Sequence, residues 1–288
     1  MYVAIDQIAG RQTATAAVCA VLDVSRSAYY AWRGAVASQR ASRDEELAPL
    51  IRAVFWKHRR RYGARRIASE LADAGQRTSP RRVARLLKIQ GLKAIQPKSF
   101  VPKTTDSRHR LGYSPNLLLE SSEPTRLDEL WVGDITYVPL RGGSFCYLAL
   151  LMDRFSRALL GWRLGETMTD ELTLAALRLA IGQRQPSAGL IHHTDRGGQY
   201  ASLRYRDVLR RAEMRQSMSR AANCYDNAFM ESCFGTIKTE LEMTEYHNYP
   251  AASREITEYL HYYGGQRKHS ALGYLTPAQF EQLNRTKS

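Results

Sequence analysis

A carboxylate inside an apolar strand constrains this chain more than any other feature of its sequence. Residues 131–140, WVGDITYVPL, are apolar on both faces of an expected strand, and Asp134 shares its face with Val132 and Val138. A strand that is apolar on both faces belongs at the centre of a covered sheet. An ionised carboxylate is costly there unless a cation or hydrogen bonds compensate for its lost hydration. The segment therefore predicts a central strand with a functional acid.

The segments that follow predict a mixed α/β domain. SFCYLALLMDRFSR and ALLGWRLGE are typical of two strands joined by a turn at Asp153 to Arg157, and GLIHHTD of another strand. TDELTLAALRLAIGQR predicts a helix that ends near Gly182, and YASLRYRDVLRRA predicts the next. RQSMSR is expected to be extended, and ANCYDNAFMESCFGTIKTELE to begin as a loop and continue as a helix. This order indicates a mixed sheet with helices packed against it.

The positive charge is concentrated in the first part of the chain. The net charge is +14, and residues 1–110 contain 22 Lys and Arg against 8 Asp and Glu, whereas the remaining residues contain 20 of each kind. A basic module joined to a neutral one indicates an arm that binds a polyanion, and nucleic acid is the better hypothesis than a merely soluble basic surface.

Two helix-turn-helix units are expected in the basic part. The first spans TATAAVCAVLDVSRSAYYAWRG, with a turn near Asp23 to Ser25 and a second helix opening near Ser27. In the second unit, Gly75 is expected to stop one helix, and Ser79 to cap the next with Pro80 at its first position. That next helix places apolar residues inward and a basic face outward, which suits a DNA groove or an ordinary solvated surface. The candidate DNA-contact residues are Arg65, Arg66, Arg81, Arg82, Arg85 and Lys88.

The domain boundaries follow from these patterns. We expect a basic helical DNA-binding region at residues 1–95, a linker at 96–127 with four prolines, and an α/β domain with a C-terminal tail at 128–288. The chain has no run of about 18 apolar residues and no secretory signal pattern at its start, and its four cysteines form no CxxC pair. We therefore expect a cytoplasmic protein with reduced thiols, outside the membrane and bound to the nucleoid when it binds DNA.

Two further acids complete a candidate constellation. Asp195 closes the strand GLIHHTD, and Glu231 lies in the first turns of a helix, with 35 residues between them. At 100° per residue, Glu231, Gly235 and Lys238 fall on one stripe of that helix. A phosphate could approach at the glycine, with Lys238 on the phosphate and Glu231 on a metal. A solvent-exposed lysine remains the alternative for Lys238.

Clustered carboxylates indicate a divalent cation. Two carboxylates about 4 Å apart repel by roughly 4 kcal/mol at an effective dielectric near 20, and a cation reverses the sign of that interaction. Mg²⁺ binds a few carboxylates together with water and phosphate oxygens, so three acids can serve two ions. Paired ions can activate the attacking oxygen and stabilise the leaving oxygen in phosphodiester chemistry.

These residues carry a resemblance that covers nearly the whole chain. WVGDITYVPL, LALLMDRFSRALLGW, GLIHHTDRGGQY, SMSRAANCYDNAFMESCFGTIKTEL and QRKHSALGYLTPAQFE resemble the integrase-type catalytic core of bacterial insertion-sequence transposases, which are related to retroviral integrases. The spacing of Asp195 and Glu231 is that of the family's D,D-35-E pattern. RRYGARRIASEL and SRSAYYAW resemble its upstream helix-turn-helix region, although Gly133 stands where the family often has threonine.

The resemblance implies a fold, a site and a reaction. The fold is an RNase H-like mixed five-stranded sheet with flanking helices, preceded by an all-α helix-turn-helix region, and its first and fourth strands are neighbours. Asp134, Asp195 and Glu231 would bind two Mg²⁺ ions, with Mn²⁺ able to substitute. The reaction is Mg²⁺-dependent DNA cleavage and strand transfer at the ends of an insertion sequence.

For several other residues, the sequence allows a structural role or a role in the site. Strand alternation puts His193 on the face of Asp195, where it either supports the site or is a satisfied structural histidine, and zinc ligation lacks further partners. Asn227 either caps the Glu231 helix or contacts DNA. A basic aromatic cluster near the C-terminus is equally compatible with packing and DNA contact; its members are Tyr262, Tyr263, Arg267, Lys268 and His269.

The expected partners are the terminal inverted repeats and target DNA, bound by a homo-oligomer. The resemblance also implies that the chain is a second-reading-frame protein, fused in some relatives to the product of an upstream frame. Two rival functions remain: a nuclease on the same fold that cuts DNA without joining it, and a transposase-derived DNA-binding regulator.

Overall fold

The structure is a computed structural model that describes residues 1–9, 14–34, 39–97, 112–119, 121–220, 227–243 and 245–285. The chain forms two units, Met1–Lys93 and Ala94–Ser288. Each unit is considered by itself below. In the described residues, no helix is both long enough and apolar enough to cross a membrane.

The first unit is entirely helical. Its first three helices are α1 (Tyr2–Ala9), α2 (Thr15–Val21) and α3 (Arg26–Arg33), and they share a small core of Ile5, Val18, Cys19 and Tyr29. Ser25 caps α3, because its Oγ accepts a hydrogen bond from the Ala28 N–H at 3.3 Å. The second helix of this helix-turn-helix unit therefore begins before Ser27, where the sequence predicted its start.

The second helical group contains α4 (Gln39–Lys57), α5 (Ala64–Asp73) and α6 (Pro80–Ile89). Ser79 caps α6 as expected, with the Arg82 N–H 3.2 Å from its Oγ and Pro80 at the first position of the helix. The helix α4 is not among the elements that the sequence predicted, although it packs against both α5 and α6. The group's core contains Leu47, Ile51, Phe55, Ile67, Leu71, Val83, Leu86 and Leu87, all buried.

The second unit is built on a mixed five-stranded sheet. The strands are β1 (Leu130–Pro139), β2 (Phe145–Asp153), β3 (Leu159–Gly165), β4 (Ile191–Thr194) and β5 (Arg215–Met218), in the order β3-β2-β1-β4-β5. The pairs β1–β2 and β2–β3 are antiparallel, whereas β1–β4 and β4–β5 are parallel. The prediction that the first and fourth strands are neighbours in the sheet is confirmed.

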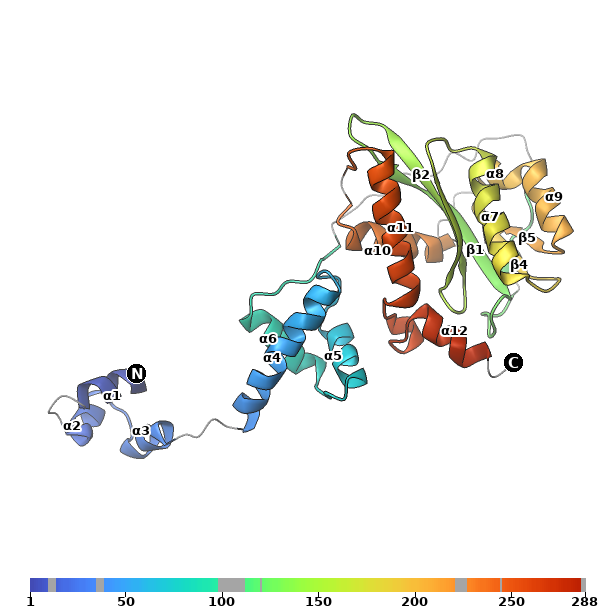
Figure 1. Cartoon of the computed structure of the whole chain (residues 1–288). Helices are drawn as coiled ribbons and strands as arrows, with labels where there is room; N and C mark the ends of the chain where they lie inside the picture. Colours follow the sequence, from blue (N-terminus) through green and yellow to red (C-terminus); the bar gives the residue numbers. More distant parts are fainter. Residues whose placement is uncertain are drawn as a thin grey trace. The chain divides into compact units, whose positions relative to one another are not determined.

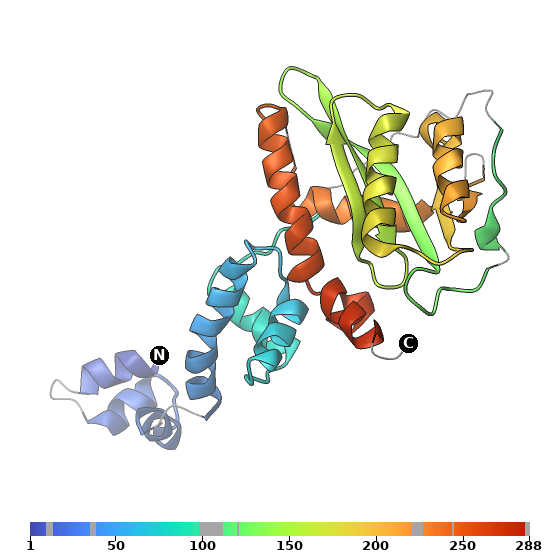
Figure 2. The same cartoon turned by 45° about the vertical axis from the view of Figure 1, so that its right-hand side comes forward.

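Helices cover both faces of this sheet (Figures 1 and 2). The helices α7 (Asp170–Arg184), α8 (Gly198–Ala201) and α9 (Leu203–Arg211) pack on one face, and α10 (Ala228–Glu240) and α11 (Tyr249–Gly265) lie on the other. The chain continues through a short turn (Ser270–Leu272) into α12 (Pro277–Arg285). The sequence did not predict α11 or α12 as helices, and the single helix expected after β4 is broken at Ser202, which caps α9.

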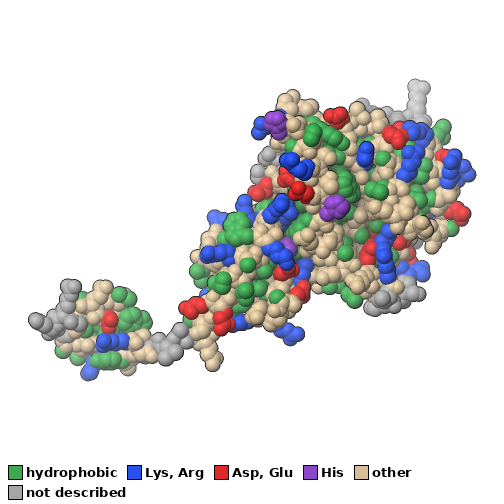
Figure 3. Space-filling model, viewed as in Figure 1, with side chains coloured by type: hydrophobic (Ala, Val, Ile, Leu, Met, Phe, Trp, Pro, Cys, Tyr) green, Lys and Arg blue, Asp and Glu red, His purple; other side chains and the backbone are tan. Residues whose placement is uncertain are grey.

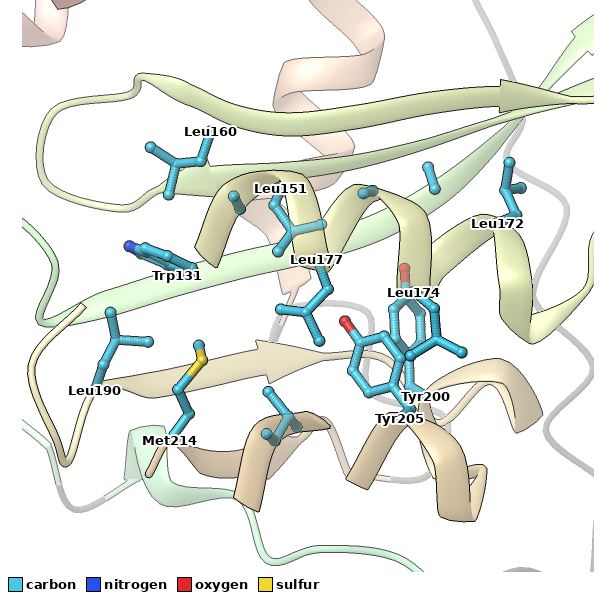
Figure 4. Close-up of a cluster of buried hydrophobic side chains, with 14 of the residues drawn as sticks. Trp131, Leu151, Leu160, Leu172, Leu174, Leu177, Leu190, Tyr200, Tyr205 and Met214 are labelled. Atoms are coloured by element: carbon cyan, nitrogen blue, oxygen red, sulfur yellow. The ribbon is translucent and has the colours of Figure 1, made fainter. Parts of the chain in front are cut away.

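The core under α7 is the main apolar cluster of the unit (Figure 4). Trp131 of β1 and Leu151 of β2 face Leu177 of α7, and all three are almost completely buried. The helix lies unusually close to β3, because a Cβ built on Gly161 would be 2.2 Å from the carbonyl oxygen of Ala176. This packing fixes one face of the sheet and leaves the opposite face, which contains Asp134, to α10.

Part of the expected linker packs along β5. The short turn Leu117–Leu119 and the residues before it lie beside this edge strand. The Leu117 N–H donates to Ser217 Oγ at 2.9 Å, and the Met218 N–H donates to the Pro115 carbonyl at 3.3 Å. Because an uncovered edge strand is a template for unwanted pairing, this segment closes the sheet on the β5 side.

Candidate active site

Two of the three expected acids meet at the centre of the sheet. The strands β1 and β4 are paired in parallel from Leu130↔Ile191 to Val132↔His193. The same register, continued two residues further, places Asp195 beside Asp134. Asp134 is partly buried within β1, and Asp195 follows the last residue of β4 directly. The topology therefore brings together two carboxylates that are 61 positions apart in the sequence.

The environment of Asp134 disfavours its negative charge. Burial raises the pKa of the Asp134 carboxyl well above its usual range, and the nearby charges of Asp195 and Glu231 raise it further. Two interactions act in the opposite direction: the Ile135 N–H donates to Asp134 Oδ1 at 2.8 Å, and the ammonium group of Lys238 is close by. The charges of Asp195 and Glu231 thus repel that of Asp134, and Lys238 offsets part of this repulsion.

The turn after β4 fixes the Asp195 side chain. The Gly197 N–H donates to Asp195 Oδ1 at 2.9 Å. A Cβ built on Gly197 would lie 3.1 Å from that oxygen and 2.9 Å from Gln199 Oε1. The glycine at this position therefore lets the turn close tightly around the carboxylate.

The helix α10 carries the third acid. Its inner face is apolar, with Met230, Cys233, Phe234 and Ile237 buried, and the helix packs against β1. Glu231 is exposed, Lys238 is half-buried, and a Cβ on Gly235 would meet nothing within 4 Å. The stripe predicted from helical geometry thus includes open space between the acid and the lysine.

Lys238 is more than a solvent-exposed lysine. Burial lowers the pKa of its ammonium group, and the charge of Asp134 opposes that shift. The lysine therefore lies within electrostatic range of the acids, on the helix that carries Glu231.

The two histidines of β4 have structural partners. His193 is fully buried, with its Nδ1 2.8 Å from Ser217 Oγ and its Nε2 3.2 Å from Ser219 Oγ. His192 is also buried, with its Nε2 2.8 Å from Tyr205 Oη, and burial lowers the pKa of its imidazole to about 3. Both ring nitrogens of His193 are therefore occupied, as expected for the structural alternative.

The absence of a side chain at Gly133 leaves room for the His192 ring on the neighbouring strand. A Cβ at position 133 would lie 3.1 Å from Cε1 of His192. The glycine found where the family often has threonine is thus matched to the histidine on the neighbouring strand.

Asn227 begins α10 without capping it. The side chain is 6% exposed and makes no capping hydrogen bond, and neither its Oδ1 nor its Nδ2 has a hydrogen-bond partner within the described ranges. Of the two expectations for this residue, capping is therefore wrong. Tyr225 and Asp226, the two residues before it, lie outside the described residues.

The donor atoms suit a hard divalent cation. Asp134, Asp195 and Glu231 offer only carboxylate oxygens, and the repulsion that raises the pKa of Asp134 is what a cation would relieve. Within the described ranges, no three histidine, cysteine or acidic side chains are already grouped closely enough to hold a metal ion. Mg²⁺ requires few protein ligands, because water and phosphate oxygens supply the others.

The C-terminal basic aromatic cluster is packed inside the unit. Arg267 Nη2 lies 2.7 Å from Glu240 Oε1, at the end of α10, and Tyr259 Oη donates to Glu240 Oε2 at 3.0 Å. Arg267, Lys268 and His269 are each less than one-tenth exposed. The cluster fastens α10 to α11 and the tail, so packing is the correct one of its two expected roles.

The candidate DNA-contact residues of the first unit fall into two groups. Arg65, Arg81 and Lys88 are exposed. Arg85 and Arg82 form ion pairs with Asp44 of α4, the latter at 3.4 Å, and Arg66 lies over the Tyr62 ring. On the face shown in Figure 3, basic side chains are spread over the chain with acidic ones among them.

The sequence analysis missed one residue near the acids. Tyr200 of α8 is buried, and burial together with the charges of Asp134 and Asp195 raises the pKa of its hydroxyl. Nothing in the spacing of the sequence distinguishes this tyrosine from other core aromatics, because α8 is only four residues long.

Comparisons with known proteins agree with this arrangement. A family model described as integrase core domain matches residues 124–224, another with the same description matches 212–277, and a model described as HTH-like domain matches 42–100. The chain is 42% identical to an insertion element IS600 uncharacterized 31 kDa protein from Shigella sonnei, over 92% of this chain and 97% of that protein. It is 37% identical to the transposase InsF for insertion sequence IS3A from Escherichia coli (strain K12), over 93% and 94% respectively.

Among solved structures, the HTLV-2 integrase catalytic core domain in complex with magnesium is similar, with 18% identity and a TM-score of 0.43 over 55% of this chain and 98% of that one. The five-stranded sheet and the integrase core matches define a polynucleotidyl transferase of the DDE transposase and integrase class. The chain belongs to the family of insertion-sequence transposases. The expected family and fold class are confirmed.

Proposed function

We propose that the chain cleaves DNA at the ends of an insertion sequence and joins those ends to target DNA, using Asp134, Asp195 and Glu231 as its catalytic acids. The observation that carries the proposal is the placement of Asp134 and Asp195 on neighbouring parallel strands, with Glu231 and Lys238 of α10 close enough to affect the charge of Asp134. A nuclease on the same fold would need the same acids, so only the products of the reaction separate the two functions.

The three acids would hold two Mg²⁺ ions, with Mn²⁺ as a substitute. Bound there, the ions would activate the attacking oxygen and stabilise the leaving one. The protein's own contribution is to hold the carboxylates on rigid elements. Asp134 lies within a fully paired strand, and Asp195 is fixed by the Gly197 N–H. No side chain is needed as a nucleophile, because water and then a DNA 3′-hydroxyl attack the phosphodiester bonds.

Lys238 would bind a phosphate next to the acids. It is two helical turns from Glu231, and Gly235 between them leaves room for a DNA backbone. Asn227, whose buried amide has no partner in the part of the chain that the structure describes, would contact the DNA at the start of the same helix.

The test is a cleavage and joining assay on DNA that carries the element's flanking ends. Wild type, Glu231→Gln and Asp134→Asn are compared with and without Mg²⁺, because each substitution removes one charge and preserves side-chain volume. We expect metal-dependent joining in the wild type, and a loss of at least about 10³-fold in both variants, as when a residue that acts only in the transition state is removed. Cleavage without joining would identify a nuclease, and tight binding without chemistry a regulator.

We also propose that α6 contacts the terminal repeats through Arg81 and Lys88, which are exposed on one face of the helix. Replacing either residue by glutamine should lower the salt dependence of DNA binding by about one unit of slope, the amount expected for one phosphate contact. Arg85→Gln serves as the comparison, because Arg85 already pairs with Asp44. If Arg81→Gln and Lys88→Gln bind DNA with the same salt dependence as the wild type, these two residues do not contact DNA phosphates.

A homo-oligomer would hold the element's two ends together. The same assay, run with the chain alone and fused to any upstream reading frame, shows whether the chain needs additional DNA-binding segments for joining. Light scattering of the DNA complex reports the number of subunits, and a single subunit per joined pair of ends would contradict this assembly.

A further inference from the structure

Two arginines from the turn between β2 and β3 lie on a single aromatic ring of α10. The guanidinium carbon of Arg154 is 3.0 Å from the centroid of the Phe229 ring, and that of Arg157 is 4.0 Å from it. Cation–π pairs normally form within about 6 Å, so both arginines are in close contact with the ring. Phe229 is two residues before Glu231, which at 100° per residue puts the two side chains about 200° apart, so the ring and its arginines lie on the other side of α10 from the acid.

The turn that carries the arginines is rigid. Asp153 is fully buried and accepts hydrogen bonds from the backbone N–H groups of Asp128, Phe155 and Ser156, at 2.8, 3.0 and 2.7 Å. The Arg157 N–H in turn donates to the Asp153 carbonyl at 2.9 Å, with Arg157 in a left-handed conformation at φ 62°. The two guanidinium groups are thus held in place before any ligand binds.

The positive charge of the pair is only partly balanced. Arg154 forms an ion pair with Glu123 at 2.7 Å, but that carboxylate is 78% exposed and is therefore weakly attractive in water. Among the described residues, Arg157 has no ion pair and no hydrogen bond from its guanidinium group, and its contact is the Phe229 ring. Burial and the neighbouring charge of Arg157 lower the pKa of Arg154 to about 10, so both groups stay charged at neutral pH and repel each other.

The surroundings on α10 add groups that suit an anion. The first N–H groups of a 13-residue helix have no intrahelical partner and give its start a partial positive charge. Asn227 adds a side-chain amide that is nine-tenths buried and has no hydrogen-bond partner among the residues that the structure describes. Arginine is the side chain best matched to phosphate oxygens, because its planar group donates two parallel hydrogen bonds.

We propose that Arg157, supported by Arg154 and the Phe229 ring, binds a DNA phosphate away from the phosphodiester that is cleaved or joined. This site deepens the proposed function and rests on it for the identity of the ligand. It adds a second phosphate contact to that of Lys238, on the opposite side of Glu231 along α10. The ring would keep the arginine side chains extended and leave their hydrogen-bonding edges for the phosphate.

The first test measures DNA affinity against salt for the full chain, with Arg157→Gln and Arg157→Lys. Arg178→Gln is the matched control, since Arg178 is an exposed arginine of α7 that pairs with Glu171 at 3.2 Å. We expect Arg157→Gln to weaken binding roughly tenfold and to lower the salt slope by about one unit. Arg157→Lys should keep most of the slope, and Arg178→Gln all of it. Unchanged slope and affinity in a folded Arg157→Gln protein would overturn the proposal.

The second test locates the phosphate. Single methylphosphonates, which are uncharged, replace phosphates in turn along the element end or along the target duplex. We expect a methylphosphonate at one position to weaken DNA binding by the wild type and to leave binding by Arg157→Gln unchanged. Whether that position lies in the element end or in the target duplex identifies the DNA that Arg157 binds. Equal costs in both proteins at every position would overturn the proposal. If the wild type shows this position-specific difference but neither cleaves nor joins DNA, the proposed function is wrong and the phosphate site is still supported.

Discussion

Replacing Asp134 by asparagine should make the catalytic unit more stable while it abolishes the chemistry. Neighbouring strands lie about 4.8 Å apart, and two unit charges about 5 Å apart repel by roughly 3 kcal/mol at an effective dielectric near 20. Because Asp134 and Asp195 are both partly exposed, solvent reduces this value, and we expect about 1–2 kcal/mol. For a unit of this size the gain corresponds to a rise in Tm of roughly 2–8 °C.

The assay is calorimetric unfolding of wild type, Asp134→Asn, Asp195→Asn and the double variant in metal-free buffer. Either single substitution removes the shared repulsion, so the second should add little, and the double-mutant cycle measures the coupling. The pKa of Asp134 is raised in the folded state, so its ionised form destabilises the fold as pH rises through that pKa. The stability gain of Asp134→Asn should therefore shrink as pH falls. Added Mg²⁺ should stabilise wild type more than the variants.

Asp153→Asn is the matched comparison. Asp153 is also buried with a raised pKa, but its oxygens accept three backbone N–H bonds, so asparagine should destabilise the fold by about 1–3 kcal/mol. The same substitution thus has opposite signs at two aspartates of one sheet. Loss of stability in metal-free Asp134→Asn would refute the repulsion argument.

Three other substitutions test the packing of the same unit. Gly161→Ala should destabilise it by at least about 2 kcal/mol in chemical denaturation, because the new methyl group meets the Ala176 carbonyl at 2.2 Å; a neutral result would contradict the close approach of α7. Arg267→Leu should cost about 3–5 kcal/mol by calorimetry, since it removes the guanidinium group beside the buried Glu240 carboxylate. His192→Gln should weaken the dependence of the unfolding free energy on pH in the acidic range. The pKa of this histidine is about 3 when folded against 6.5 normally, so wild type loses up to about 1.4 kcal/mol per pH unit below 6.5, and an unchanged slope in urea unfolding would count against it.

The candidate site could be predicted in large part because its signals are local. An aspartate in an apolar strand, a second acid at the end of another strand, and a glutamate on a helix with a matched apolar face each follow from short-range patterns. The cap at Ser79 is similarly local. The helices α11 and α12 were missed, and so was the break at Ser202, although each start has a local cap: Asn248, Thr276 and Ser202 each accept a backbone N–H bond from the residue three positions later.

The side chains around the acids depended on the tertiary structure. Alternation gave His193 the same face as Asp195, yet β5 decides its role by occupying both ring nitrogens with serines. Arg267 belongs to a segment that composition alone makes a candidate for DNA binding, but Glu240, 27 positions earlier, holds it inside the unit. The positive charge of a side chain predicts that it can bind an anion, and the tertiary structure shows which anionic group it contacts.

The sequence by itself determined the family and the type of sheet through the motifs that resemble insertion-sequence transposases, and it marked Asp134, Asp195 and Glu231 as candidate acids. The resemblance implied that the strands of Asp134 and Asp195 are neighbours, and the tertiary structure decided the register that aligns the two acids, because no local signal fixes how two distant parallel strands pair. It also decided that Arg154 and Arg157 meet Phe229, which is more than 70 positions away. Forces between charges and rings act over a few ångströms in space, and the distance along the chain does not enter into them.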